Sequence, residues 1–284
     1  MSNSRAGHVA RSTVRPYSET GTCTPLRTFL PTADGISIDS VYNPGAAVYN
    51  GSPSSTVHPV FVIAHGFTGD ADRPPVRRVA DAFARYGAVV TFSFRGHGRS
   101  GGRSTVGDKE VLDLEAAVEW ARSLGHTRVV TVGFSMGGSV VLRHAALHKG
   151  VDAVVSVSAP ARWYYRGTVA MRRVHWLITR PEGRLLGRVG FRTRIHHRDW
   201  DPIPLSPTEA VPRIAPVPLL IVHGDRDGYF PLDHPRMLAA AAGECGELWL
   251  EPGMGHAEDA ADDALLTRIG DWAVARAGGA GGLA

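Results

Sequence analysis

Gly133-Phe134-Ser135-Met136-Gly137 joins a β-branched run at residues 128–132 to an apolar helical segment that begins at Gly138. A turn this sharp between a strand and a helix holds its central residue in strained backbone geometry. It also requires small neighbours, because the strand and the helix approach each other closely. Ser135 is therefore a candidate nucleophile with an exposed hydroxyl. A glycine-rich turn of this kind can also be purely structural, so the motif alone leaves both interpretations open.

The rest of the chain alternates between apolar, β-branched runs and segments with helical spacing. A hairpin is expected around Asp34-Gly35, within residues 28–41, and a loop is expected over 43–59. Further strands are expected at 60–64, 88–94, 151–158, 218–222 and 247–250, and helices at 75–85, 108–123, 233–242 and 259–277, with one more helix directly after Ser135. This alternation predicts right-handed crossovers and an α/β fold with a mostly parallel, doubly wound sheet.

The alternation stops between residues 160 and 215. This segment shows no clear strand, but it has a helical stretch at 168–179 and a proline-rich return. An ordered insertion of this length is usually functional. We therefore expect one domain over residues 25–277, with a helical insertion at about 160–215 ahead of the strand at 218–222. Residues 1–24 are expected to form a disordered lead-in, and residues 278–284 a flexible tail.

The composition is that of a globular protein without a membrane span. Of the 284 residues 43% are hydrophobic and 20% charged, and no apolar stretch approaches the roughly 20 residues that a span needs. The first residues lack the apolar core of a secretory signal, and Cys23 and Cys245 imply no disulfide framework. These features predict a cytoplasmic protein. The net charge of +4 comes without a nucleic-acid-binding motif, so we expect no nucleic-acid partner.

Two further residues lie at the ends of predicted strands, where they can meet Ser135. Asp227 follows the strand at 218–222, and His256 follows the strand at 247–250. The carboxyl ends of parallel strands share one edge of a sheet, so the three side chains can converge there. A serine hydroxyl is a weak nucleophile at neutral pH and needs a base and a group that orients the base. We therefore predict a triad of Ser135, His256 and Asp227, with Asp225 as an alternative acid.

Five ordered motifs make the chain resemble the α/β-hydrolase family from about residue 60 to the C-terminus. They are His65-Gly66-Phe67, Phe94-Arg95-Gly96-His97-Gly98-Arg99-Ser100, the turn at Ser135, His223-Gly224-Asp225-Arg226-Asp227, and Gly255-His256. The resemblance implies a sheet of the α/β-hydrolase type, with residues 160–215 as a helical cap over the active site. It implies Asp227 as the acid of the triad. It also implies that the backbone N–H groups of Phe67 and Met136 form the oxyanion hole.

Several other histidines could be read as functional. His65 and His97 lie in glycine-rich turns beside the predicted site, and we expect them and His223 to hold loop backbone. His144 and His148 stand four residues apart on the helix after Ser135, but no third ligand and no H-E-x-x-H motif accompany them. We therefore predict no metal and no cofactor.

The predicted cap carries both aromatic side chains and positive charge. Trp163, Tyr164 and Tyr165 are candidates for lining the substrate pocket, and the alternative is that they form the cap's own core. Residues 160–215 contain eleven arginines and four carboxylates, a net charge of +7 that exceeds the +4 of the whole chain. These arginines fit an anionic substrate, an anionic membrane surface, or a solvated surface with no partner.

Together these features predict a cofactor-independent serine hydrolase with a small-molecule acyl substrate. Ser135 is expected to attack a carboxylic ester, or a thioester or amide, and to form an acyl-enzyme. An acyltransferase, a peptidase or a cofactor-free perhydrolase would use the same triad. The fold also serves as a ligand-binding module without catalysis. The sequence separates none of these alternatives and does not define the oligomeric state.

Overall fold

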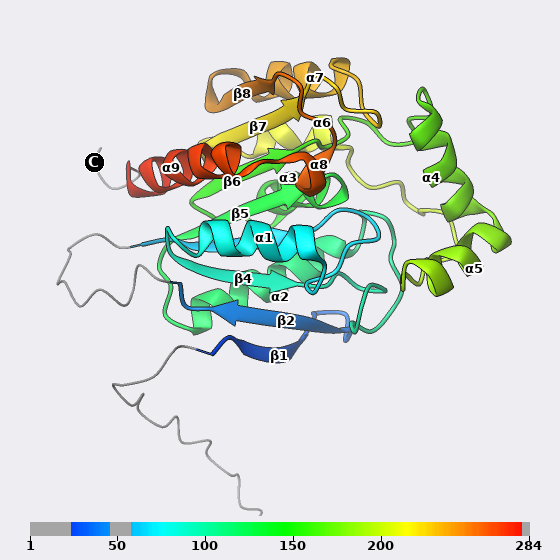
Figure 1. Cartoon of the computed structure of the whole chain (residues 1–284), viewed down its shortest axis with the longest axis horizontal. Helices are drawn as coiled ribbons and strands as arrows, with labels where there is room; N and C mark the ends of the chain where they lie inside the picture. Colours follow the sequence, from blue (N-terminus) through cyan, green and yellow to red (C-terminus); the bar gives the residue numbers. More distant parts are fainter. Residues whose placement is uncertain (1–23, 46–57, 280–284) are drawn as a thin grey trace, which may run out of the picture.

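A computed structural model describes residues 24–45 and 58–279 and places an eight-stranded sheet between two layers of helices (Figure 1). The strands are β1 (Leu26–Pro31), β2 (Ser37–Asn43), β3 (Val60–Ala64), β4 (Ala88–Phe92), β5 (Val129–Phe134), β6 (Ala153–Val157), β7 (Leu219–Gly224) and β8 (Gly246–Glu251). Their order across the sheet is β1-β2-β4-β3-β5-β6-β7-β8. The pairs β1–β2 and β2–β4 are antiparallel and all other neighbours are parallel. The prediction of a mostly parallel α/β sheet is confirmed.

Helices cover both faces of this sheet. One face carries α1 (Pro74–Phe83), α8 (Ala257–Ala260) and α9 (Asp263–Gly279), and the other carries α2 (Glu110–Ser123), α3 (Met136–Leu147), α6 (Pro207–Ala210) and α7 (Asp233–Ala242) (Figure 1). Successive side chains of a strand point to opposite faces. Accordingly, Val60 and Val62 of β3 join the core that α2 and α3 close, whereas Phe61 and Ile63 join the core under α1 and α9. All of β3 is buried, as a strand covered on both faces should be.

The sharp turn between β5 and α3 forms where the sequence predicts it. Ser135 has a φ of 51°, a left-handed conformation that is strained for a residue with a side chain. A methyl group on Gly137 would overlap the carbonyl oxygen of Ala64, and one on Gly133 would overlap the carbonyl oxygen of Gly137. Only glycine fits at either position. These two residues therefore allow α3 to begin directly against β3 and β5.

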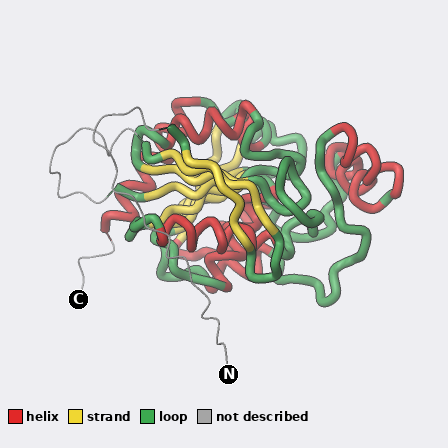
Figure 2. The backbone as a smooth tube through the Cα atoms, turned by 90° about the horizontal axis from the view of Figure 1, so that it is seen from below, coloured by secondary structure: helices red, strands yellow, loops and turns green. Residues whose placement is uncertain are grey.

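The insertion of residues 160–215 leaves the sheet after β6 and returns at β7. Its helices α4 (Val169–Thr179) and α5 (Pro181–Gly190) form a hairpin that stands apart from the sheet at one end of the strands (Figures 1 and 2). The return segment is tied to the loop after β4 through Arg194. Its N–H donates to the Gly96 carbonyl at 2.7 Å, and its carbonyl accepts from the Ser104 N–H at 2.7 Å. The short helix α6 and the 3-10 helix η1 (Val211–Arg213) then pack against α3.

Some boundaries differ from the prediction. Helix α5 was not predicted, because three glycines within ten residues lower its helix propensity. The expected helix over 259–277 is divided into α8 and α9, and α9 reaches Gly279, two residues past the predicted end of the helix. The strand expected at 88–94 ends at Phe92, and a 3-10 helix η2 (Gly243–Cys245) follows α7. The predicted lead-in apart from Thr24, residues 46–57 of the predicted loop and the rest of the tail lie outside the described residues.

Within the ranges that the structure describes, none of the helices combines the length and the apolar character needed to cross a membrane. Cys245 is unpaired and exposed, and Cys23 lies outside the described residues.

The close contact at Gly137 gives a direct test of the turn. We expect Gly137→Ala to lower the free energy of unfolding by about 3 kcal/mol or more, because its methyl group meets backbone rather than a side chain that could move. Gly278→Ala is the matched control: a methyl group there meets no neighbour within 4 Å, so the same substitution should be neutral or slightly stabilising in helix α9. Denaturant unfolding compares the two. Equal stability of both variants would contradict this account of the turn.

Candidate active site

Three predicted residues meet at the carboxyl edge of the sheet. The Nε2 atom of His256 lies 2.9 Å from the Oγ atom of Ser135, and its Nδ1 atom lies 2.7 Å from a carboxylate oxygen of Asp227. Because a carboxylate only accepts, Nδ1 carries the proton and Nε2 is free to accept one from the serine. A hydroxyl, an imidazole and a carboxylate are thus joined in series, although Ser135 and His256 stand 121 residues apart in the sequence.

The surroundings of Asp227 keep it ionised. Burial acts to raise the pKa of this carboxyl, but the hydrogen bond and charge of His256 outweigh burial, so the pKa lies below its ordinary value. Two backbone donors add to this effect: the N–H groups of Tyr229 and Phe230 donate to Asp227 Oδ1 at 2.7 and 3.1 Å. Asp225, the alternative acid, instead accepts from the N–H of Gly253 at 2.7 Å, in the turn before His256.

The start of α3 and the loop of Gly66 lie beside Ser135. Met136 is the first residue of α3, where N–H groups have no partner within the helix and the helix dipole favours negative charge. On the other side, Gly66 lies so close that a methyl group on it would be 3.4 Å from the Cβ of Ser135. Phe67 and Met136 both line the cavity that contains Ser135 and His256. The two residues that the family resemblance implies for the oxyanion hole therefore line the same cavity as Ser135.

The loop that carries Phe67 is held by buried side chains. His65 donates from Nδ1 to the carbonyl of Gly66 at 2.7 Å and accepts at Nε2 from the N–H of Phe94 at 3.0 Å. This pairing requires the neutral imidazole, and burial, together with neighbouring His97, lowers the pKa of His65 to about 3. Glu258 accepts from the N–H of Gly66 at 2.9 Å, and burial raises the pKa of this carboxyl.

Glu258 and Tyr229 are the site residues that the sequence analysis missed. The Tyr229 ring stacks on the imidazole of His256 with a centroid separation of 4.2 Å, and Tyr229 supplies one of the backbone donors to Asp227. Both positions stand two residues beyond a member of the predicted triad. That proximity is the signal that could have singled them out.

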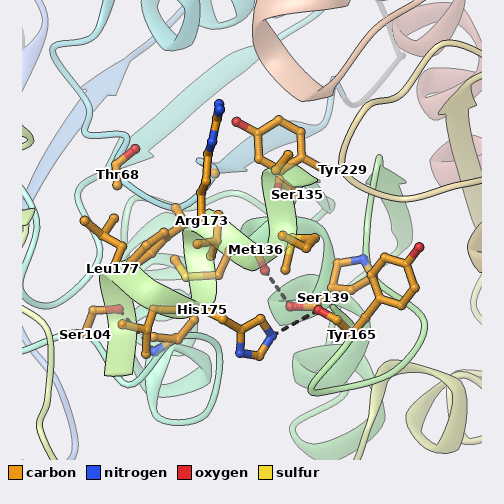
Figure 3. A pocket seen from close by; sticks show the side chains of 18 of the residues that line it. Thr68, Ser104, Ser135, Met136, Ser139, Tyr165, Arg173, His175, Leu177 and Tyr229 are labelled. Carbon is orange, nitrogen blue, oxygen red and sulfur yellow. Dashed lines mark hydrogen bonds between the residues drawn. The ribbon is translucent and has the colours of Figure 1, made fainter. Parts of the chain in front are cut away.

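A cavity of about 710 Å³ opens between the sheet edge and helix α4, and its volume is typical of small-molecule sites. Ser135, Met136 and Tyr229 line it from the sheet side, and Arg173 and Leu177 line it from α4 (Figure 3). Its walls are largely apolar. The apolar side chains from the cap include Trp163, Ala170, Met171, Val174, Trp176, Leu177, Ile178, Leu186, Phe191 and Trp200.

The three aromatic residues predicted for the pocket all line this cavity, and each also packs within the cap or against its base. Trp163 donates to the carbonyl of Pro204 at 2.9 Å and meets the ring of Trp200 edge-on at 5.1 Å. Tyr165 packs edge-on against His234. Tyr164 is the most exposed of the three, at 54%. The sequence left open whether these residues line the pocket or form the core of the cap, and the same side chains do both.

The other histidines singled out from the sequence contact backbone or carboxylate groups. His97 contacts the Arg95 carbonyl at 3.0 Å, and His223 contacts the carbonyl of Phe230 at 2.8 Å, as expected. His144 and His148 stack on each other beside Glu115, which bonds His144. Among the described residues, no group of three or more His, Cys, Asp or Glu side chains has an arrangement that could hold a metal ion.

The comparisons with known proteins identify the fold. Residues 59–177 match the model of a family described as the alpha/beta hydrolase fold, and the chain has the α/β-hydrolase fold. A curated relative, the monoacylglycerol lipase of Mycolicibacterium smegmatis, is 27% identical over 250 residues, which cover 72% of this chain and 83% of the relative.

Two solved structures show the same fold at low sequence identity. The esterase Pf2001 of Pyrococcus furiosus aligns with a TM-score of 0.68 and 24% identity, covering 95% of this chain and 99% of the esterase. The alpha/beta hydrolase GrgF from a Penicillium species also aligns with a TM-score of 0.68, at 19% identity, covering 89% of this chain and 99% of GrgF.

The buried imidazoles make stability depend on pH. Burial lowers the pKa of His97 to about 4 in the folded protein, against about 6.5 in an unfolded chain. Between these values the unfolded state binds a proton that the folded state does not, so stability falls as the pH falls. When the pH falls from 7.5 to 5.0, protonation of His97 in the unfolded state should lower the free energy of unfolding by about 2 kcal/mol. The His97→Gln variant should lack this part of the decrease.

Denaturant unfolding of wild type and variant at the two pH values measures the difference. His197→Gln, which changes an exposed imidazole, is the matched control and should follow the wild type. A His97→Gln protein that loses as much stability on acidification as the wild type would refute this role of burial.

Proposed function

We propose that this protein is a serine hydrolase that cleaves a carboxylic ester through an acyl-enzyme, with Ser135 as nucleophile, His256 as base and Asp227 as the group that orients His256. The observation that carries the proposal is the continuous hydrogen-bonded series from Asp227 through His256 to Ser135, with links of 2.7 and 2.9 Å. The names of the lipase and esterase relatives support the ester as the bond that is cleaved.

In the proposed reaction, His256 Nε2 takes the hydroxyl proton as Ser135 Oγ attacks the ester carbonyl. The negative charge on the former carbonyl oxygen is stabilised by the N–H groups of Phe67 and Met136. Loss of either donor would raise the activation free energy by about 3 kcal/mol. His256 then gives its proton to the leaving alcohol, and the acyl group stays on Ser135. Water, activated by the same imidazole, releases the acid. Ionised Asp227 stabilises the imidazolium in both halves of the reaction.

The cavity supports an ester with an apolar acyl or alcohol part. The charged residues that line it are four arginines and three carboxylates: Arg162, Arg166, Arg173, Arg198, Asp199, Glu258 and Asp259. Because these charges largely balance, the lining favours an uncharged ester over the anionic substrate that the net charge of the cap suggested. We propose that residues 160–215 act as the cap that closes this cavity and that Trp163, Tyr164 and Tyr165 belong to its substrate-binding wall. Thioester or amide cleavage, acyl transfer and a cytoplasmic location stay predictions.

Labelling of Ser135 tests the nucleophile. We expect a fluorophosphonate to label the wild-type protein and to leave Ser135→Ala unlabelled, and we expect the same variant to lose turnover of a short p-nitrophenyl ester by at least about 10⁴-fold. Ser139→Ala is the matched control, because it removes another serine that lines the cavity, and it should stay labelled. Labelling of Ser135→Ala would refute the assignment. A wild-type protein that gives one burst and no steady turnover would instead be a binding module.

The choice between two acids is tested by a pair of isosteric variants. Asp227→Asn cannot hold His256 in the required tautomer, so kcat should fall by about 10⁴-fold. Asp225→Asn keeps an acceptor for the N–H of Gly253 and touches neither His256 nor Ser135, so its kcat should stay within about threefold of wild type. Steady-state kinetics on the same ester compares them. A larger loss in Asp225→Asn than in Asp227→Asn would reverse the assignment.

A further inference from the structure

Helix α5 of the cap turns its large apolar side chains to solvent. Leu185, Leu186 and Val189 are 63%, 48% and 74% exposed, although a helix of a globular protein normally buries such residues. Its buried residues are instead Gly183 and Gly187. This arrangement is the reverse of a helix that packs its apolar face on a core.

The glycines explain how the helix is oriented. A methyl group on Gly183 would collide with the backbone of Trp176 and Leu177, and one on Gly187 would press on Ile195. The glycine side is therefore fixed against α4 and the return segment. At 100° per residue, Leu185 and Val189 lie within about 40° of each other on the opposite side, and Leu186 stands about 60° further round.

Arginines flank this apolar side and enclose a second pocket. The pocket has a volume of about 140 Å³ and is lined by Arg103, Arg184, Arg188, Arg194, Ile195 and His197; we call it the arginine pocket. None of the described carboxylates lines it. Arg184 is fixed on the carbonyls of Ile178 and Thr179, and Arg194 on that of Gly102. Four positive charges gathered without a counter-charge favour a bound anion.

The exposed apolar side adjoins the catalytic cavity. Trp176, Leu186 and Phe191 belong to its lining and are also 46%, 48% and 39% exposed. A partner seated on α5 would therefore lie at the mouth of the cavity that holds Ser135. Figures 1 and 2 show the α4–α5 hairpin at the periphery of the molecule, where a flat surface can reach it.

We propose that the cap docks on an anionic phospholipid surface, with Leu185 and Val189 inserted among the acyl chains and a headgroup phosphate in the arginine pocket. Interfacial helices combine apolar and basic sides in this way. A second copy of the chain fits less well, because residues 169–192 carry six arginines and one carboxylate and two such faces would repel each other. The surface goes beyond the proposed reaction and does not depend on which residue is the nucleophile.

Vesicle binding tests the proposal. The full chain carrying Ser135→Ala is used, so that no lipid is consumed during the measurement. Vesicles of phosphatidylcholine alone are compared with vesicles that also contain phosphatidylglycerol. We expect binding at least about tenfold tighter to the anionic vesicles, weakening as salt is raised. Equal binding to both kinds of vesicle, or binding to neither, would overturn the proposal.

Two substitutions separate the apolar and the charged contributions. In the same background, Leu185→Ser with Val189→Ser should weaken vesicle binding by about tenfold, and Arg188→Ala by about fivefold. The matched controls are Leu147→Ser, which changes an exposed leucine at the end of α3, and Arg213→Ala, which changes an exposed arginine in η1. Both controls should bind as the parent does. None of these residues lines the catalytic cavity, so with Ser135 restored all variants should hydrolyse a dissolved ester normally.

Two other measurements exclude the alternatives. In sedimentation velocity, we expect no dimer that depends on the apolar side of α5. A wild-type dimer that Leu185→Ser disrupts would assign this surface to a second copy of the chain and overturn the proposal. The second measurement is binding of inorganic phosphate. If phosphate binds the wild type but not Arg188→Ala, and the protein does not bind vesicles, the arginine pocket is a site for a soluble anion and the proposal is overturned. Loss of catalysis in Ser135→Ala leaves all of these readouts intact.

Discussion

The rest of the site depends on one close approach, the contact of the Gly137 backbone with the carbonyl of Ala64. Because neither Gly133 nor Gly137 carries a side chain, the helix α3 starts directly at the end of β5 and turns the Ser135 hydroxyl outward at a φ of 51°. A strained residue persists only where its surroundings over-determine it. Here the surrounding strands are buried on both faces, so the sheet supplies the rigidity that the turn requires.

Two buried groups of the site, Asp227 and His65, differ in charge because their hydrogen-bond partners differ. Asp227 is buried yet keeps a low pKa, since His256 and two main-chain donors favour the carboxylate. His65 is buried with one donor and one acceptor satisfied, so it stays neutral and fixes the loop of Phe67. Both arrangements place polar groups inside the protein only where each has a partner.

Most of the fold and the three central site residues could be predicted because their signals are local. A β-branched run, a glycine turn and a polar residue at the end of a strand are each legible within a few residues, and parallel strands bring such ends together. The position of Glu258 against Gly66 could not be predicted, since it depends on how α8 packs over another loop. Helix α5 was concealed because its glycines face inward and its leucines outward, against the usual pattern.

The two groups proposed to bind the developing oxyanion, at Phe67 and Met136, are main-chain amides. A change of side chain at either position leaves the amide in place, so single-residue variation can hardly delete this part of the machinery. The cap is different, because it contributes to the cavity wall and to the outer side of α5 through its side chains, which a substitution does change. Substitutions within residues 160–215 can therefore change which molecules fit beside Ser135 while the two main-chain amides stay in place.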